Sequence, residues 1–90
     1  MCGIIAIIEN GGVKKLDISA ALTSLSNRGP NDKGTVVFPT CLLGQTRLSI
    51  IDLESGHQPM RDNKRDMAIT FNGEIYNYRE LKKELAAKGY

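Results

Sequence analysis

The strongest feature of the hydrophobic pattern is an unbroken apolar run near the start of the chain, at residues 4–8. Turn-forming residues follow at positions 9–12, and a short apolar run bounded by turn signals is typical of a strand. Because polar residues do not interrupt the run, we predict a strand over residues 3–8 that is buried on both faces. Cys2 would then lie at the mouth of a central strand.

A second pattern predicts a helix after this turn. Asp17 can cap its N-terminus. Four apolar residues then recur at helical spacing, which gives the helix one inward face: Ile18, Ala21, Leu22 and Leu25. We expect the helix to end at residues 27–30, where Gly29 permits a positive φ and Pro30 cannot continue a helix.

Extended and turn-rich segments alternate along the middle of the chain. Two short strands are predicted near residues 35–38 and 41–44, and an extended apolar segment follows at 45–52. Residues 54–66 are polar and rich in turn formers, which predicts a surface loop, and residues 67–71 have the pattern of another strand. The chain should therefore contain four or five strands.

A second helix is expected at the end of the chain. It begins near Asn77, with Glu80 as its capping-box partner, and Gly89 would end it. Its apolar face would carry Tyr78, Leu81 and Leu85. No repeat, low-complexity tract or linker interrupts these elements, so we predict one continuous domain.

Composition and charge argue against several classes of protein. With 41% hydrophobic residues, 24% charged residues and a net charge of +2, the chain has no basic excess for a nucleic acid or a membrane surface. The apolar start is too short for a signal peptide or a membrane span, so we expect a cytoplasmic protein. Two cysteines and one histidine are too few for a structural metal site, and we expect both thiols to be free.

Cys2 is the strongest candidate for chemistry. Removal of Met1, which the small Gly3 allows, leaves Cys2 with a thiol and a free α-amine on one residue. An α-amine has a reference pKa of about 7.7–8, close enough to neutrality to serve as the base for a nucleophile. The alternative is that Cys2 is the small, buried start of a strand.

Two further positions each have a structural and a functional interpretation. Arg47 has only uncharged neighbours, so it is either a solvated arginine at a strand edge or an anchor for a carboxylate. Asn72-Gly73 is a strong hairpin-turn signal, which would leave Glu74 as an exposed acid. Alternatively, the Asn72 side-chain amide and the Gly73 N–H are paired donors to a developing oxyanion.

Five motifs, in register along the chain, resemble the start of the glutamine-hydrolysing asparagine synthetases. They are Met1-Cys2-Gly3-Ile4, Arg28-Gly29-Pro30, Arg47-Leu48-Ser49-Ile50-Ile51-Asp52, Gly56-His57-Gln58-Pro59 and Phe71-Asn72-Gly73-Glu74-Ile75-Tyr76-Asn77. The resemblance covers essentially the whole chain. Five motifs in the right order are far more specific than any one of them.

The resemblance implies an α+β fold of the N-terminal-nucleophile hydrolase type, a sandwich with α/β/β/α layers and antiparallel sheets. Residues 1–90 would be the amino-terminal half of a class II (type 2) glutamine amidotransferase domain. The remainder of that domain and a synthetase domain would lie outside this chain. We therefore expect the segment by itself to form an incomplete sandwich and to be inactive.

The resemblance also implies a role for each candidate residue. Cys2 would attack the side-chain amide of glutamine, and Asn72 with the Gly73 N–H would form the oxyanion hole. Arg47 would bind the α-carboxylate of glutamine and Glu74 its α-ammonium group. The remaining residues of the implied glutamine site are Leu48, Ser49, Ile50 and Ile51.

The implied reaction needs a partner domain. Ammonia released from a Cys2 thioester would reach a carboxy-terminal synthetase domain of the same parent chain, which amidates aspartate. The resemblance implies no cofactor or metal in this chain, with ATP and magnesium used by the synthetase domain, and it leaves a homodimer of the parent open. Two alternatives also stay open: a related amidotransferase with a different carboxylate acceptor, and a truncated, non-catalytic fragment.

Three positions depart from the family pattern. Asn31 stands where an acid is common, and Asn27 where a histidine often precedes the Arg-Gly-Pro motif. Gln45 stands where a histidine often lies two residues before the clamp arginine. None of the three is assigned to the chemistry.

Overall fold

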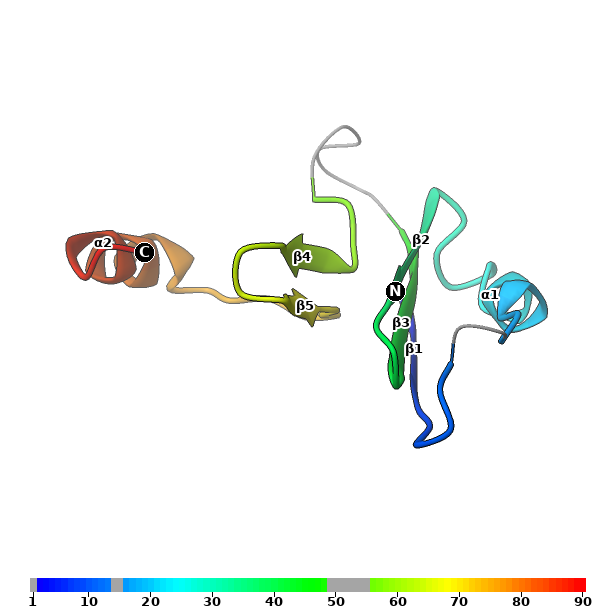
Figure 1. Ribbon diagram of the computed structural model, residues 1–90. Helices are drawn as coiled ribbons and strands as arrows, with labels where there is room; N and C mark the ends of the chain where they lie inside the picture. Colours follow the sequence, from blue (N-terminus) through cyan, green and yellow to red (C-terminus); the bar gives the residue numbers. More distant parts are fainter. Residues whose placement is uncertain (1, 14–15, 49–55) are drawn as a thin grey trace.

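The chain folds into two small antiparallel sheets and two helices. In the computed structural model, which describes residues 2–13, 16–48 and 56–90, three strands form one sheet and two strands form another. In chain order the elements are β1 (Gly3–Ile8), α1 (Ser19–Ser24), β2 (Asp32–Val37), β3 (Cys41–Arg47), β4 (Met60–Asp62), β5 (Met67–Ile69) and α2 (Tyr78–Ala87). The predicted α+β class with antiparallel sheets is confirmed. Figure 1 shows α1 and the β4–β5 sheet on opposite sides of the three-stranded sheet.

The three-stranded sheet has the order β1-β3-β2, and both neighbours run antiparallel to β3. The predicted strand at residues 41–44 and the extended segment after it form one continuous strand as far as Arg47. Residues 49–52 of that segment lie outside the described residues. Because side chains alternate along β3, one of its faces meets α1 and the other is turned toward the β4–β5 sheet.

β1 confirms the strand predicted at residues 3–8, but the prediction that both of its faces are buried is wrong. Within the described part of the chain β1 pairs with β3 alone, so it is an edge strand. Ile5 and Ile7 pack against the core, whereas Ile4 is 42% and Ile8 is 78% exposed. An unbroken apolar run shows that both faces of a strand are able to be buried. It does not show that other residues of the same segment bury both of them.

The core lies between α1 and one face of the three-stranded sheet (Figure 1). Its buried members are Val13, Ile18, Leu22 and Leu42, with Ile5 and Ile7 packed against them. The N-cap residue is Ile18 and not the predicted Asp17, but Asp17 Oδ1 accepts a hydrogen bond from Ser19 N at 2.8 Å at the helix start. Gly44 lets the helix approach β3 closely, since a Cβ at Gly44 would lie 3.0 Å from Cδ1 of Ile18. Ala21, which was expected on the inward face, is exposed.

The segment after α1 differs from the prediction at Gly29. The helix ends at Ser24, and Gly29 is not among the glycines with a positive φ. Its missing side chain serves a close approach instead, because a Cβ at Gly29 would lie 2.5 Å from the backbone N of Arg47. Pro30 forms a β-bridge with Arg47, and Asn31 N donates to Arg47 O at 2.9 Å. The Arg-Gly-Pro motif therefore packs on the last residue of β3.

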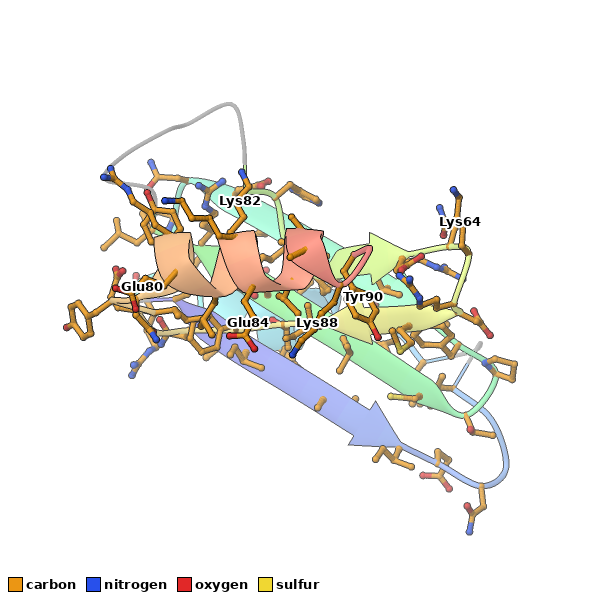
Figure 2. The ribbon with its side chains drawn as sticks, turned by 90° about the vertical axis from the view of Figure 1, so that its left-hand side faces the viewer. Lys64, Glu80, Lys82, Glu84, Lys88 and Tyr90 are labelled. Atoms are coloured by element: carbon orange, nitrogen blue, oxygen red, sulfur yellow. The ribbon has the colours of Figure 1, made fainter. Side chains whose placement is uncertain are left out.

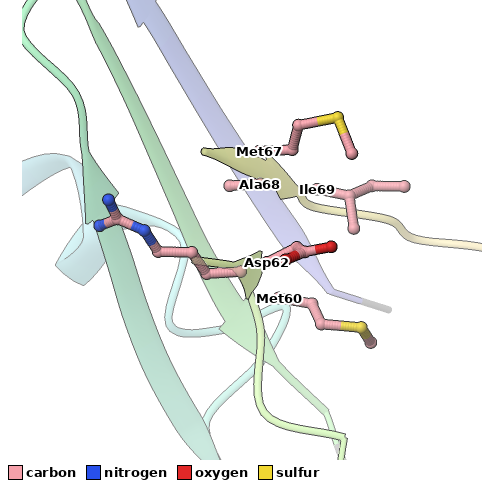
Figure 3. Close-up of a pocket in the computed structure, with 6 residues that line it drawn as sticks. Met60, Asp62, Met67, Ala68 and Ile69 are labelled. Atoms are coloured by element: carbon pink, nitrogen blue, oxygen red, sulfur yellow. The ribbon is translucent and has the colours of Figure 1, made fainter. Parts of the chain in front are cut away.

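β4 and β5 form a hairpin, and β4 lies within the segment that was predicted to be a surface loop, at residues 54–66. The hairpin turn occupies residues 63–66, where Asp66 has a φ of 50°. β5 ends at Ile69, two residues before the predicted end. Figure 3 shows the side chains of Met60, Met67 and Ile69 on one face of the hairpin, where they line a pocket. All three side chains are more than half exposed.

α2 confirms the predicted second helix, and Gly89, with a φ of 90°, follows its end as expected. The predicted capping box is wrong, because the Asn77 side chain makes no capping hydrogen bond. The apolar face of the helix is partly exposed, by 39% to 55% at its three predicted residues: Tyr78, Leu81 and Leu85. Figure 2 shows Glu84 and Lys88 on one side of the helix, where they form an ion pair of 2.9 Å. Neither of the described helices is long and apolar enough to cross a membrane.

Candidate active site

One end of the three-stranded sheet brings three polar residues into a row. Gly3 pairs with Thr46 across β1 and β3, so the next position outward places Cys2 beside Arg47. On the other side of β3, Arg47 pairs with Asp32. Because side chains alternate, Cys2, Arg47 and Asp32 share the face turned toward the β4–β5 sheet. The strand register thus places the predicted nucleophile next to the predicted carboxylate clamp.

The start of β1 is fixed through Thr46. Gly3 N donates to Thr46 Oγ1 at 3.2 Å, and this hydroxyl donates to Leu25 O, also at 3.2 Å. The contact is tight, since a Cβ at Gly3 would lie 2.8 Å from Thr46 Oγ1. Cys2 itself is half-buried, so it is held close to the sheet without being enclosed in the core.

Asn72, on the segment that follows β5, contacts Cys2. Its Nδ2 atom donates a hydrogen bond to the backbone carbonyl of Cys2 at 3.3 Å. The hairpin-turn interpretation of Asn72-Gly73 is wrong, because neither residue has the positive φ that a type I′ turn requires. The Asn72 amide carries two hydrogens, so one remains for a further acceptor beside the nucleophile.

Gly73 and Glu74 follow on an exposed segment that leads to α2. A Cβ at Gly73 would lie 2.7 Å from Cζ of the Phe71 ring, so a side chain here would displace that ring. Glycine at this position therefore keeps the backbone N–H next to Asn72 approachable.

Arg47 is the last residue of the central strand β3 and does not lie on an edge strand of the described sheet. It is half-buried, and its guanidinium lies against Gly56, where a Cβ would be 3.1 Å from one terminal nitrogen. Gly56 has a φ of 75°, a conformation that glycine adopts without strain. Two glycines thus pack on Arg47. Gly29 lies against its main chain, and Gly56 lies against its side chain.

Asp32 and His57 form a side-chain hydrogen bond next to Arg47. His57 Nδ1 donates to Asp32 Oδ2 at 2.5 Å. This hydrogen bond holds the pKa of the Asp32 carboxyl below its ordinary value, and the Lys33 N–H at 2.8 Å and the charge of Arg47 act in the same direction. The sequence pointed to His57 only as part of the Gly-His-Gln-Pro motif, so this pairing was not predicted.

Further polar contacts lie beside Gln45, two residue pairs along the sheet from Arg47. Gln45, a departure from the family pattern, is 1% exposed, and its Oε1 accepts a hydrogen bond from the Thr70 hydroxyl. Gln58 Oε1 accepts a hydrogen bond from Phe71 N at 2.7 Å. Sequence reasoning missed these contacts, although a glutamine in the middle of a buried strand was a signal for a specific polar partner.

The second cysteine lies far from this site. Cys41 begins β3 and pairs with Ile8, at the end of the sheet opposite to Arg47. At about 3.4 Å per residue, the six-residue step from Cys41 to Arg47 spans about 20 Å. Both cysteines are free thiols, and no three histidine, cysteine or acidic side chains come together in the described part of the chain.

Part of the predicted glutamine site lies outside the described residues. Leu48 follows β3 and is 39% exposed, whereas three further residues of the implied site lie outside the described residues: Ser49, Ile50 and Ile51. Of the predicted site, the structure therefore brings together Cys2, Arg47 and Asn72, with Gly73 adjacent.

Comparison with known proteins identifies the family. The family model for the glutamine amidotransferase domain matches residues 1–90. The chain belongs to the glutamine amidotransferase domain family. This confirms the family that the five motifs indicated.

Curated relatives of this glutamine amidotransferase chain are asparagine synthetases. It is 40% identical over 88 residues to asparagine synthetase [glutamine-hydrolyzing] 2 of Arabidopsis thaliana, which covers 94% of this chain and 15% of the relative. The identity to the Asparagus officinalis asparagine synthetase [glutamine-hydrolyzing] is 36% over 93 residues, which covers 100% of this chain and 16% of the relative. The corresponding Zea mays protein is 40% identical over 88 residues, covering 94% of this chain and 15% of that protein. The chain thus spans only about a sixth of the length of these relatives, and no solved structure matches it.

Proposed function

We propose that this chain supplies the front part of a glutaminase site that hydrolyses glutamine to glutamate and ammonia through a thioester on Cys2. The observation that carries the proposal is the hydrogen bond from Asn72 Nδ2 to the Cys2 carbonyl, which holds an amide donor beside the only cysteine at this end of the described sheet. The relatives are named as glutamine-hydrolysing asparagine synthetases, which supports the same reaction.

Arg47 and Glu74 provide one charge of each sign for the two charged ends of free glutamine. The planar guanidinium of Arg47 gives two parallel hydrogen bonds to the α-carboxylate, and Glu74 pairs with the α-ammonium group. Because Arg47 lies beside Cys2 on one face of the sheet, a glutamine bound through its carboxylate has its side-chain amide near the sulfur. Both ends of the ligand must lose water on binding, so both need a partner of opposite charge.

The chemical step uses two groups of one residue. After removal of Met1, the α-amine of Cys2 takes the thiol proton, and the sulfur attacks the side-chain amide carbon of glutamine. The tetrahedral oxyanion accepts hydrogen bonds from the second Asn72 Nδ2 hydrogen and from the Gly73 N–H. The intermediate collapses as the amine returns its proton to the departing ammonia. Water then attacks the thioester and releases glutamate and the thiol.

The fold that we propose for the complete domain is the N-terminal-nucleophile sandwich. In Figure 1 the order across the molecule is α2, the β4–β5 sheet, the three-stranded sheet and α1, which is the order of layers in that fold. Apolar side chains are exposed on the hairpin and on α2, which is evidence that a larger structure covers them in the complete domain. They include Met60, Met67, Ile69 and Leu85.

In the full-length protein we propose that ammonia passes to a synthetase domain that amidates aspartate in the cytoplasm. That domain would use ATP and magnesium, whereas the hydrolysis of glutamine at Cys2 requires neither of them. The names of the relatives, of which this chain covers 15–16%, support the amidation of aspartate.

Glutamate release by the full-length protein tests the proposal. Cys2→Ala should abolish glutamate release from glutamine, whereas Cys41→Ser, at the opposite end of β3, should leave it nearly unchanged. A mass spectrum of the amino terminus shows whether Met1 is removed. A protein that begins at Cys2, is folded and releases no glutamate would contradict the proposal and would favour a non-catalytic role.

A further inference from the structure

The segment that carries Asn72 lies between β5 and α2 and belongs to neither. Residues 70–75 form no helix or strand, and Asn72 is exposed. A donor to an oxyanion must nevertheless keep a fixed position relative to the nucleophile, because catalysis depends on donors that are already in place. Something outside this segment has to hold it against the sheet.

Two glutamines make hydrogen bonds to the two residues directly before Asn72. Gln45 accepts from the hydroxyl of Thr70 through its Oε1 atom, and Gln58 accepts from the backbone N of Phe71 at 2.7 Å. One bond reaches a side chain and the other reaches the main chain. Consecutive residues of the same segment are therefore fixed from two directions.

Gln45 is part of β3, the strand that also positions the nucleophile Cys2. It precedes Thr46, whose hydroxyl accepts the hydrogen bond from Gly3 N at 3.2 Å and so fixes the residue after Cys2. Two adjacent residues of β3 thus hold the two halves of the site. Thr46 holds the start of β1, which follows Cys2, and Gln45 holds the segment that carries Asn72. A shift of either half relative to β3 would lengthen the contact between Asn72 Nδ2 and the Cys2 carbonyl.

The burial of Gln45 also points to a specific role. The residue is 1% exposed, and its Nε2 atom has no hydrogen-bond partner among the described residues. An apolar side chain would fill this position without enclosing an unsatisfied donor, so the amide is poorly explained by packing alone. The Gln45–Thr70 bond is what an apolar residue could not provide.

Gln58 is held in place by its own glycine contact. Its backbone carbonyl lies over Gly34, the cross-strand neighbour of Gln45, where a Cβ would be 2.1 Å from the carbonyl oxygen. The neighbouring His57 is tied to Asp32 by the 2.5 Å contact. The Gly-His-Gln-Pro segment is therefore docked on β2, and Gln58 extends from it to the Phe71 N–H.

We propose that Gln45 and Gln58 are positioning residues, which hold the Asn72 segment at a fixed distance from Cys2. The proposal rests on the proposed glutaminase function for its kinetic effect, whereas its structural part stands on the contacts alone. Neither glutamine touches the substrate amide. Their effect on catalysis is exerted through Thr70 and Phe71.

Paired variants of the full-length protein test the proposal. Thr70→Val removes the hydroxyl at nearly constant shape, and Thr70→Ser retains it. Gln58→Leu removes the acceptor for the Phe71 N–H, and Gln58→Glu retains it. Gln45→Met, alone and combined with Thr70→Val, tests whether the two side chains act as one unit.

We expect Gln45→Met, Thr70→Val and Gln58→Leu each to lower kcat for glutamine about tenfold, less than the 10²–10³ for loss of an oxyanion donor itself. KM for glutamine should stay within about twofold, since no contact to the bound substrate is lost. The Gln45→Met/Thr70→Val double variant should be no slower than either single variant. Thr70→Ser and Gln58→Glu, which keep the hydrogen-bonding group, should retain most of the wild-type kcat.

Amide hydrogen exchange gives a readout that needs no activity. Exchange at residues 70–73 should become faster in Gln45→Met, Thr70→Val and Gln58→Leu, with no change in α2. Unchanged exchange in this segment, or equal losses in Thr70→Val and Thr70→Ser, would overturn the proposal. Wild-type protein that releases no glutamate would contradict the proposed function alone, and the exchange comparison would still decide whether the two glutamines position this segment.

Discussion

Asn72 and Cys2 are seventy positions apart in the sequence, and the Asn72 side-chain amide donates a hydrogen bond to the Cys2 backbone carbonyl at 3.3 Å. The contact joins the segment after β5 to the start of β1, two parts of the chain that share no strand pairing. It also makes the environment of the two cysteines different, because Cys41 lies at the other end of β3.

A free amine on Cys2 should be required for glutaminase activity. An acylated nitrogen has no basic lone pair, so it cannot take the thiol proton. We expect a full-length protein with a tag fused directly before Cys2 to be inactive, and to gain activity when a protease leaves Cys2 as the first residue. Glutamate release is measured before and after cleavage. Full activity of the uncleaved fusion would show that the amine is not the base.

Arg47 and Asn72 should have separate kinetic signatures. Arg47→Lys should mainly raise KM for glutamine, because a point charge replaces a planar fork that matches the carboxylate. Asn72→Ala should mainly lower kcat, by about 10²–10³ if Asn72 acts as a single oxyanion donor. Steady-state kinetics at varied glutamine separate the two effects. If both variants changed KM alone, Asn72 would have no role in the transition state.

Gly29→Ala should destabilise the protein, whereas Gly11→Ala should not. A Cβ at Gly29 would lie 2.5 Å from the Arg47 backbone N, and backbone atoms cannot move aside as the end of a side chain can. Overpacking of this kind costs about 1–3 kcal/mol. At Gly11, where a Cβ would meet nothing within 4 Å, the change should stay within about 0.5 kcal/mol. Urea unfolding of both full-length variants measures the difference, and equal stabilities would refute the packing role of the Arg-Gly-Pro motif.

Asp32 should make stability depend on pH on the acid side. Because the His57 hydrogen bond lowers the pKa of the folded Asp32 carboxyl, its contribution is fully present above the unfolded pKa, about 3.9. The contribution is lost as the pH falls through the lower, folded pKa. The stability difference between wild type and Asp32→Asn should therefore shrink as the pH falls below about 4. Denaturant unfolding across that range measures it.

A matched control for Asp32 is Asp66→Asn. Asp66 pairs with Arg61 at 3.4 Å, and its side chain is 77% exposed, so the pair contributes little to stability. Its removal should leave the acid-side pH dependence in place. An identical pH profile for wild type and Asp32→Asn would contradict the assignment to the Asp32–His57 pair.

Residues 1–90 made alone should be neither a stable fold nor a glutaminase. Large apolar side chains are exposed along the chain, Ile8 by 78% and Met60 and Ile69 by 57% each. The edge strand β1 also offers unpaired backbone groups for aggregation. Thermal unfolding, light scattering and glutamate release are compared with the full-length protein under the same conditions. A monodisperse segment with a cooperative transition would disprove the stability prediction, and Cys2-dependent turnover would disprove the other.

Local patterns in the sequence determined the elements that depend on neighbouring residues. The apolar run at residues 4–8 predicted β1, and the helical spacing before Gly89 predicted α2, because the periodicity of each element is visible within a few neighbouring residues. The five motifs likewise determined the family and selected Cys2, Arg47 and Asn72. These conclusions needed residue types and spacing only.

Tertiary structure decided which of the local alternatives each motif takes. Asn72-Gly73 has the sequence of a turn, and its contact with Cys2 exists because the chain places the segment after β5 on the side of the three-stranded sheet opposite to α1. Gly29 was expected to end a helix, and it packs on Arg47 instead. The burial of Gln45 and its bond to Thr70 depend on strand register, which a sequence window does not contain. Contacts between distant segments are set by how complete faces pack together, and so only the folded chain fixes them.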